Sequence, residues 1–433
     1  MHILLRIPYA AAGAAARAAA YLAPAGDGKV RSSLRARRGI RARFADWGAR
    51  DRDVRRPLVW LHAPSVGEGL QARPVIARLR ERRPDVQIAY TFFSPSAEKF
   101  AQRLGADFCD YLPFDTAGDA NAALDALRPT ALVFSKLDVW PVLAEHAAAR
   151  GIPLGLISAT LSASSARRSG MGALLLRDAY RALDAVGAVS SDDAARLRQL
   201  GVRGDRVSVT GDARYDEAWA RARAAERQRA LLEPLKSGRP TLVAGSTWPA
   251  DETPLLEAWR VVREKMPDAR LVMAPHEPVP SHLDPIVRWA VRAGLRCATL
   301  SDPAAASADV VLVDRVGVLG DLYALADVAY VGGGFHAAGL HSVIEPAAFG
   351  APVLFGPRHA ASRDAALLLA CRGGFSVGSA TEIATRVLAL FAEPAARSTA
   401  GDHARALVQG GLGAADRSAA LVEELIGRYN LPV

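Results

Sequence analysis

The sequence is poor in cysteine and lacks several signatures of nucleotide and nucleophile chemistry. Its three cysteines, Cys109, Cys297 and Cys371, are far apart and form no CxxC pair. That pattern excludes a disulfide framework and a paired-cysteine zinc site, and it favours a reducing, cytosolic environment. No GxGxxG or GxxxxGK[ST] segment occurs, and Ser65 in HAPSVGE is not framed by a GxSxG elbow. Nicotinamide chemistry, ATP hydrolysis and a serine hydrolase triad are therefore disfavoured.

The N-terminal segment lacks the long apolar run of a membrane-spanning helix. Residues 1–24 are apolar and alanine-rich but are interrupted by Arg6, Pro8 and Arg17, so they fall short of the ~20 clean apolar residues of a span. Residues 29–56 then carry eleven basic and three acidic side chains, most of the formal net charge of +9. We predict an interfacial or weakly inserted anchor and a polybasic leader that meets anionic lipid on the cytoplasmic side. Alanine and arginine are abundant throughout the chain. The alternative is therefore that this segment only reflects the general composition of the protein and has no role at a membrane.

The placement of this charge also bears on nucleic acid. A nucleic-acid-binding protein is expected to carry a basic face on a folded domain, with aromatic residues for stacking. Here the positive charge is concentrated in a leader, and the remaining chain is nearly neutral. We therefore expect no nucleic-acid partner.

Two sets of alternating strand-like and helix-like segments follow the leader. The first includes LVWLHA, VQIAYT, TALVFS and IPLGLIS, and the second includes PTLVAGST, ARLVMAP, DVVLVD and DVAYVGGG. Such alternation predicts parallel sheets with helices on both faces. We expect an α/β fold of GT-B type, two doubly wound Rossmann-like domains facing across a cleft, with ligands beyond the carboxyl ends of strands. The expected divisions are a leader at 1–56, a first domain at 57–215, a connector at 216–238 and a second domain at 239–433.

Two segments place polar groups directly after a strand-like run. In LVWLHAPSVGEGL, Glu68 falls in the first turn of an expected helix, where it either complements the dipole as a cap or faces a ligand. In VGGGFHAAGLHSVIEPAAFG, glycines precede a helix expected to begin near His341. Glycines let backbone amides approach a ligand, and Glu345 would then contact a ribose or only complement the dipole. Asp51 and Asp53 form a DxD, but no strand precedes them, which disfavours a metal-diphosphate site.

Taken in order, these segments resemble those of the 3-deoxy-D-manno-octulosonic acid (Kdo) transferase family, over almost the whole chain. HAPSVGE resembles the family's SVGE block, TFFSPSAEKF its threonine-rich block, and YLPFD its YLPYD. LISATLSASS is similar to its N-A-R-L-S segment, and GGGFHAAGLHSVIEPAAFGAPVLFGP to its CMP-site block. Each block alone is weak, but their joint occurrence is highly specific.

The resemblance implies roles for individual residues. Glu68 matches the catalytic base, and Arg214 in TGDARYD matches a basic residue that stabilises the transition state. The stretches that hold CMP correspond to Pro275 and His276, to Gly317, Val318 and Leu319, and to Ser342, Val343, Ile344 and Glu345.

The chain also departs from the family at three of these places. Lys136 replaces the first acid of E-T-E-L-W-P, where this chain reads KLDVWP with Asp138 at the second acid. His276 replaces an arginine beside the proline, and Ser342 replaces an asparagine. These changes put in doubt which groups hold the donor carboxylate, and we expect Lys136 to join Arg214 in the catalytic group.

The implied reaction is an inverting transfer of Kdo from CMP-Kdo to a hydroxyl of the lipid A precursor lipid IVA, in lipopolysaccharide core biosynthesis at the inner membrane. Glu68 would take the hydroxyl proton, with its pKa raised in a partly dry cleft. We expect no cofactor and no metal. Two rivals remain: another GT-B enzyme, such as a lipid-A-disaccharide synthase or a nucleotide-sugar epimerase, and a non-catalytic nucleotide-binding protein of the membrane surface.

Overall fold

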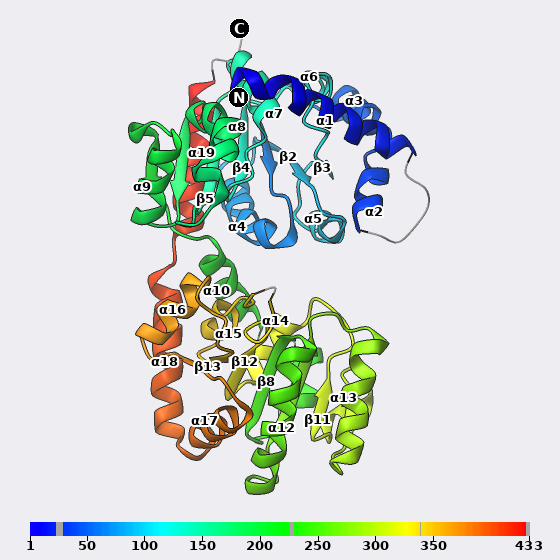
Figure 1. Cartoon of the computed structure of the whole chain (residues 1–433), viewed down its shortest axis with the longest axis vertical. Coiled ribbons are helices and arrows are strands. Elements are labelled where there is room, and N and C mark those ends of the chain that lie inside the picture. The colour runs from blue at the N-terminus through cyan, green and yellow to red at the C-terminus, as the bar shows by residue number, and fades with distance from the viewer. Residues whose placement is uncertain (23–28, 226–228, 338, 430–433) are drawn as a thin grey trace. The chain divides into compact units, whose positions relative to one another are not determined.

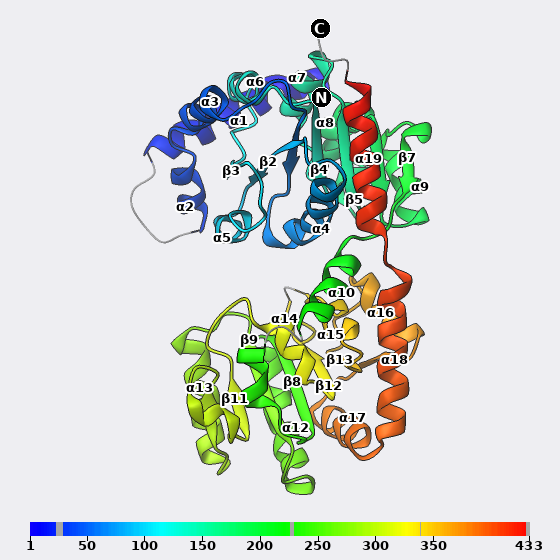
Figure 2. The ribbon, with the colours of Figure 1, turned by 180° about the vertical axis from the view of Figure 1, so that it is seen from behind.

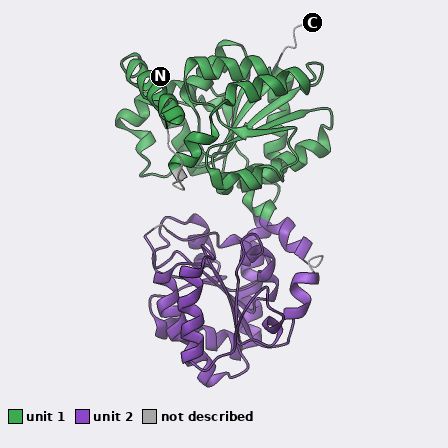
Figure 3. Ribbon diagram, turned by 90° about the vertical axis from the view of Figure 1, so that its right-hand side faces the viewer, with its two compact units in different colours: residues 1–217, 412–433 green, residues 218–411 purple. Residues whose placement is uncertain are grey.

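The computed structural model describes residues 1–22, 29–225, 229–337 and 339–429, and it divides the chain into two compact units (Figures 1 and 3). Unit 1 contains residues 1–217 and 412–433, and unit 2 contains residues 218–411. Each unit is built around one parallel sheet of seven strands with its own buried core. The predicted α/β class with two Rossmann-like sheets is confirmed.

The sheet of unit 1 has the order β3-β2-β1-β4-β5-β6-β7 and is parallel throughout. Its central strands are buried at every residue, which is why they read as continuous apolar runs rather than as alternating ones. The chain turns from one side of the sheet to the other at β1 and β4, where a doubly wound sheet forms its ligand site. The strands are β1 Leu58–His62, β2 Gln87–Phe92, β3 Phe108–Tyr111, β4 Ala131–Ser135, β5 Leu154–Ala159, β6 Ala185–Ala188 and β7 Val207–Val209.

Helices cover both faces of this sheet (Figures 1 and 2). They are α1 Ile3–Leu22, α2 Lys29–Ala36, α3 Ile40–Arg50, α4 Val66–Arg82, α5 Glu98–Ala101, α6 Ala117–Leu127, α7 Pro141–Ala149, α8 Gly170–Arg181, α9 Ser191–Leu200 and α19 Ala414–Arg428. Helix α10, Arg214–Ala224, begins in unit 1 and ends in unit 2.

The sheet of unit 2 has the order β10-β11-β9-β8-β12-β13-β14 and is also parallel. Its change of direction lies between β8 and β12. The strands are β8 Thr241–Thr247, β9 Arg270–Pro275, β10 Cys297–Thr299, β11 Val310–Leu312, β12 Val328–Val331, β13 Val353–Phe355 and β14 Gly374–Ser376. The helices are α11 Arg229–Leu232, α12 Pro249–Lys265, α13 Pro280–Arg292, α14 Leu319–Leu322, α15 Ile344–Ala348, α16 Arg363–Ala370, α17 Ala380–Ala392 and α18 Pro394–Gly410.

The end of the chain differs from the expected division, which assigned residues 239–433 to one domain. Helix α19 lies in unit 1, alongside α4 and β5 (Figure 2). Its apolar side chains, Val422 and Leu425 among them, are buried in the core of unit 1, and Leu425 occupies the space that a side chain at Gly155 would need. An amphipathic pattern shows that a helix has a core-facing side but does not show which core it faces, so this docking could not be predicted.

The basic segment also differs from a solvated leader, because much of it is integrated into unit 1. Helix α3 packs on α6, with Ile40 and Phe44 buried. Arg37 is buried and donates to the carbonyl oxygen of Leu112, and burial lowers its pKa to about 10. Arg43 forms an ion pair with Asp110 at 2.6 Å. In the part of the chain that the structure describes, no helix is both long and apolar enough to cross a membrane.

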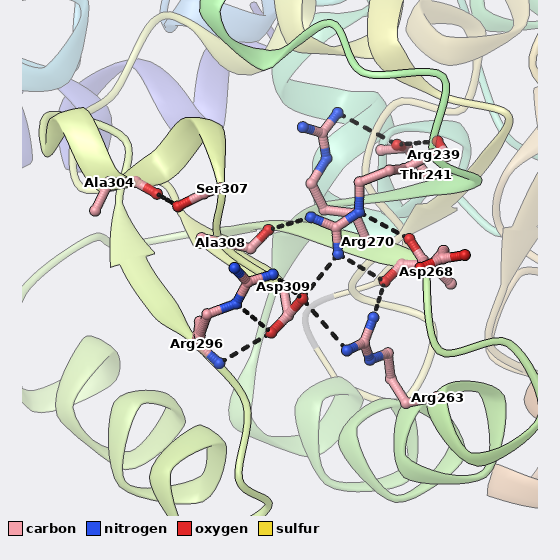
Figure 4. A network of polar contacts seen from close by, with 11 residues as sticks. Arg239, Thr241, Arg263, Asp268, Arg270, Arg296, Ala304, Ser307, Ala308 and Asp309 are labelled. Atoms are coloured by element: carbon pink, nitrogen blue, oxygen red, sulfur yellow. Dashed lines mark hydrogen bonds and ion pairs between the residues drawn. The ribbon is translucent and has the colours of Figure 1, made fainter.

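A network of arginines closes the amino ends of the strands in unit 2 (Figure 4). Asp309, which precedes β11, lies within 3.3 Å of guanidinium groups of Arg239, Arg263 and Arg296. Burial raises the pKa of Asp309, but the hydrogen bonds and charges of these arginines outweigh that effect and hold the pKa well below its usual value. Ligands of doubly wound sheets bind at the carboxyl ends of the strands, so we assign this network at the amino ends to the stability of unit 2.

Candidate functional site

Glu68 lies at the carboxyl end of β1, in the first turn of α4. The hydroxyl of Ser65 caps α4 by accepting from the backbone amide of Gly67. The carboxylate of Glu68 accepts a hydrogen bond from that same hydroxyl and forms an ion pair with Lys136, with 2.9 Å between Nζ and Oε1. Ser65 therefore provides the cap, and Glu68 is directed toward Lys136, which directly follows β4. The two residues meet where the sheet of unit 1 changes direction.

The direction in which the pKa of Glu68 is shifted differs from the sequence-based expectation of a raised pKa. Burial raises its pKa, as expected, but the hydrogen bond from Ser65 and the positive charge of Lys136 outweigh burial and hold the pKa below its usual value. In this arrangement Glu68 is a carboxylate at neutral pH. Lys136 has a backbone φ of 64°, an uncommon conformation for a residue with a side chain and one that recurs at functional sites.

Arg214 begins α10 and is held by Asp212. Its Nε and Nη2 atoms donate to Oδ2 of Asp212 at 2.9 and 2.6 Å. Asp212 is buried, and Gln71 of α4 donates to its other oxygen at 3.3 Å. Because Gln71 follows Glu68 by three residues, one helix turn connects the carboxylate with the residues that fix the arginine. The structure thus brings all three predicted catalytic residues, Glu68, Lys136 and Arg214, to the surroundings of α4.

A second polar group lies at the same edge of the sheet and was not predicted as part of the site. His62, the last residue of β1, is buried, and its Nε2 atom accepts from the indole of Trp140 at 3.1 Å. The same indole nitrogen donates to Asp138 at 3.2 Å, and Trp140 stacks on Phe93 at 5.6 Å between ring centroids. A sequence signal existed, because each of these residues ends or follows a strand. These groups extend the polar and aromatic surface next to Lys136.

The three predicted nucleotide stretches gather at the carboxyl ends of β8, β9 and β12 in unit 2. Pro275 ends β9, and the ring of His276 stacks on that of His341 at 4.5 Å. Leu319 fills the space next to Gly245 near the end of β8. The remaining residues of the three stretches are Gly317, Val318, Ser342, Val343, Ile344 and Glu345. The structure therefore places these stretches around one edge of one sheet.

Individual residues of these stretches differ in what they can offer to a ligand. Val343 and Ile344 are 1% exposed, so their side chains are packed in the core of unit 2 and do not face a ligand. Gly317 has a φ of 90°, and its carbonyl accepts from Arg221 at 2.9 Å. Glu345 lies in the first turn of α15 and its charge raises the pKa of buried Tyr323, after burial itself. The helix starts at Ile344, not near His341 as expected, and has five residues.

The glycine segment after β12 serves packing more than ligand binding. A side chain at Gly332 would meet the backbone of Ser246, and one at Gly334 would meet the backbone of Gly356. The amides of Gly333 and Phe335 donate to the buried carboxylate of Asp251, at 2.8 and 3.0 Å. The expectation that these amides approach a ligand is therefore wrong for Gly333 and Phe335. Asp251, in GSTWPADE, was missed because nothing in the sequence links it to the glycines.

Neither unit shows a site for a metal ion in the residues that the structure describes: no group of three or more His, Cys, Asp or Glu side chains has the geometry to hold one. The carboxylate of Asp53, part of the DxD segment, instead pairs with Arg55. Lys136 pairs with Glu68 and Arg214 pairs with Asp212, and the rings of His276, His336 and His341 lie together near the nucleotide stretches.

Comparison with known proteins gives consistent relatives. Residues 35–217 match the family model described as 3-Deoxy-D-manno-octulosonic-acid transferase (kdotransferase). The 3-deoxy-D-manno-octulosonic acid transferase of Bordetella pertussis is 32% identical over 410 residues, which cover 89% of this chain and 91% of that protein. The enzyme of the same name from Haemophilus influenzae is 27% identical over 304 residues, covering 69% of this chain and 70% of that protein.

Among solved structures, UDP-GlcNAc 2-epimerase from Neisseria meningitidis bound to UDP-GlcNAc superposes with a TM-score of 0.63 at 16% identity. The match covers 86% of this chain and 100% of the epimerase chain. A UDP-N-acetylglucosamine 2-epimerase structure matches with a TM-score of 0.59 at 15% identity, covering 86% of this chain and 97% of that one. At such identities the likeness concerns the fold of two Rossmann-like units and says nothing of the reaction.

Proposed function

The chain belongs to the 3-deoxy-D-manno-octulosonic acid (Kdo) transferase family, and we propose on this premise that it moves Kdo from CMP-Kdo to a hydroxyl of the lipid A precursor lipid IVA. Family membership makes the protein a glycosyltransferase that transfers Kdo in lipopolysaccharide biosynthesis. The donor, the acceptor and the roles of individual residues are the parts that we propose. The observation that carries them is the carboxylate of Glu68, fixed at the carboxyl end of β1 by Ser65 and Lys136.

In the proposed reaction Glu68 is the general base. An acceptor hydroxyl gives its proton to a carboxylate oxygen of Glu68 while the hydroxyl oxygen forms a bond to the anomeric carbon of Kdo. The bond from that carbon to the phosphate of CMP breaks, the electron pair leaves with CMP, and the configuration inverts. Because Glu68 is already ionised, it can accept the proton without a prior deprotonation step.

Positive charge is the second requirement of this reaction, because negative charge grows on the departing phosphate. Arg214 is held rigidly by two hydrogen bonds to Asp212, so its guanidinium needs little reorganisation to meet such charge. Lys136 supplies a second positive charge, which also forms the ion pair with Glu68. With these side chains in place we propose that the reaction needs no metal and no cofactor.

We also propose that unit 1 rests on the cytoplasmic face of the inner membrane. Helix α1 exposes large apolar side chains, Ile3 at 74%, Leu4 at 77% and Ile7 at 82%. Helix α8 adds exposed Met171 and Leu174, and the two helices are joined because the amide of His2 donates to the carbonyl of Leu174. Exposed apolar groups of this size on adjoining helices are typical of a surface that enters a lipid interface.

One reconstitution tests the donor and the acceptor together. The purified chain is incubated with CMP-Kdo and tetra-acylated lipid A precursor, and the molecular mass of the lipid product is measured by mass spectrometry. We expect a mass increase of one or more Kdo units with the wild type and a loss of two or more orders of magnitude in rate with Glu68→Gln. Stabilisation of the chain by UDP but not by CMP in a thermal melt would instead favour a UDP-sugar enzyme.

A further inference from the structure

Helix α1 is fixed to two other helices of unit 1. The amide of His2 donates to the carbonyl of Leu174 in α8 at 3.1 Å, and Arg6 forms an ion pair with Glu145 of α7 at 2.6 Å. The Arg6–Glu145 pair is solvated, with the two side chains 55% and 42% exposed, so alone it stabilises the arrangement little. A second link between α1 and α7 is buried and is made through a third segment.

This buried link is the carboxylate of Asp115, which lies between β3 and α6 and is 8% exposed. The hydroxyl of Tyr9 donates to it at 2.7 Å, and the backbone amides of Val142 and Leu143 donate to it at 3.0 and 2.8 Å. These amides belong to the first turn of α7, where helix amides need an acceptor from outside the helix. Trp140, the residue before α7, cannot supply one, because an indole only donates. Asp115 therefore caps α7 while it binds α1.

The protonation of Tyr9 and Asp115 keeps this link in place at neutral pH. Burial, and then the charge of Asp115, raises the pKa of Tyr9 well above its ordinary value, so the hydroxyl keeps its proton. Burial also raises the pKa of Asp115, and the hydrogen bonds from Tyr9 and the two amides oppose that rise. Loss of the Tyr9 hydroxyl would leave a buried carboxyl group with fewer donors, which is costly.

The first turn of α7 adjoins the turn that holds Lys136. This turn runs from Lys136 to Trp140, directly before α7, and its first residue has the positive φ of 64°. A residue with a side chain stays in such a conformation only where its surroundings hold it. Helix α8 holds the turn because the hydroxyl of Tyr180 donates to the carbonyl of Leu137 at 2.8 Å. Helix α7 holds the end of the turn, since Trp140 leads into the amides that Asp115 fixes.

We infer that Tyr9 is a positioning residue for the reaction: through Asp115 it fixes the start of α7, and thereby the turn that presents Lys136 to Glu68. Helix α1 is then a working part of the catalytic unit as well as a candidate membrane anchor. The inference rests on the proposed function only in its kinetic readout, because the effect on the turn is measurable without substrate.

The first test is hydrogen–deuterium exchange of the full chain without substrate, followed by mass spectrometry of its peptides. Tyr9→Phe removes the hydroxyl and keeps the ring. We expect the amides of residues 136–145 to exchange several-fold faster in this variant than in the wild type, because their local structure opens more often. The matched control is Tyr21→Phe, which removes the hydroxyl of a 58% exposed tyrosine on the same helix and should exchange like the wild type.

The second test is steady-state kinetics with CMP-Kdo and a detergent-solubilised acceptor, so that binding to a membrane is not measured. Tyr9→Phe should lower the turnover number by about three- to ten-fold and leave the Michaelis constant of the donor unchanged. The acid limb of turnover should also move to higher pH, because a loosened turn weakens the effect of the Lys136 charge on Glu68. A merely structural role would reduce the amount of active enzyme at every pH and leave the limb in place.

A double variant tests whether Tyr9 acts through Asp115. Asp115→Asn keeps the size of the side chain but removes its charge, so it weakens the cap on α7. Tyr9→Phe should then add little to the loss already present in Asp115→Asn. Additive losses in the double variant would show that Tyr9 acts by another route and would overturn the inference.

Equal exchange of residues 136–145 in the wild type, Tyr9→Phe and Tyr21→Phe would overturn the inference whether or not the chain is active. Faster exchange in Tyr9→Phe with an unchanged turnover number and acid limb would overturn the positioning role. Faster exchange together with no Kdo transfer by the wild type would support the link from α1 to the turn and would count against the proposed donor and acceptor.

Discussion

The ion pair between Lys136 and Glu68 should set the pH at which the enzyme loses activity on the acid side. Glu68 is 15% exposed and Lys136 is 44% exposed, with 2.9 Å between their charged atoms. Because the lysine is partly solvated, we discount the pair to about 1 kcal/mol, roughly a five-fold change in the protonation equilibrium of Glu68. Lys136→Met removes the cation, so burial is then opposed mainly by Ser65 and the pKa of Glu68 rises.

The measurement is the turnover number against pH from 3.0 to 8.5, with saturating CMP-Kdo and acceptor; the range extends below pH 4.5 because the pKa of Glu68 is held below its usual value. A protonated Glu68 cannot accept the hydroxyl proton, so the acid limb of the Lys136→Met profile should move to higher pH. Lys136→Arg retains the charge and is the control; its acid limb should coincide with that of the wild type. Ser65→Ala removes the other donor to Glu68 and should shift the limb in the same direction as Lys136→Met.

Two results would refute this reasoning. If the acid limbs of the wild type, Lys136→Met and Lys136→Arg coincide, the ion pair does not control the protonation of the base. If Lys136→Met lowers the rate equally at every pH, Lys136 acts on the charge of the substrate and not on Glu68.

Three other predictions follow from the sites described. Arg214→Ala should lower the turnover number by about 2–4 kcal/mol of barrier, whereas Glu345→Gln should mainly raise the Michaelis constant for CMP-Kdo; steady-state kinetics with the opposite pattern would remove both assignments. Asp309→Asn should lower the free energy of unfolding by about 2–3 kcal/mol at pH 7. Because the folded-state pKa of Asp309 is depressed, its contribution is present above its unfolded pKa and is lost as the pH falls through the folded pKa, so urea unfolding should show the two proteins converging at acid pH. Changing Ile3 and Ile7 together to serine should release the chain from anionic vesicles in a flotation assay without lowering its melting temperature, and unchanged binding would place the membrane contact elsewhere.

The basic leader shows where sequence reasoning stops. Counting charges correctly found that residues 29–56 are strongly basic, but it could not show which arginines find partners within the fold. Arg41 pairs with Asp119, and Arg43 pairs with Asp110. These acids lie 78 and 67 residues away. They come close because α3 packs on α6, which carries Asp119, and on β3, which carries Asp110. Replacing these arginines would therefore test the stability of unit 1 before it tested binding to lipid.

The site itself could be predicted in outline, because strand ends are visible in the sequence. Runs such as LVWLHA and DVAYV are buried strands in the structure, and the residues that follow them lie at one edge of each sheet. The order of the strands was the missing information. Trp248 and His341 are 93 positions apart, yet they share a hydrogen bond because β8 and β12 are neighbours in the sheet.

The departure from the family pattern at Lys136 has a physical consequence that can be tested. An acid is replaced there by a cation, whose charge helps to hold Glu68 ionised. In the proposed reaction this change favours activity at lower pH, because the base stays deprotonated there. Restoring the family's acid with Lys136→Glu should therefore raise the pKa of Glu68 and move the acid limb of turnover to higher pH. The limb should move further than in Lys136→Met, because Lys136→Glu adds a negative charge as well as removing a positive one.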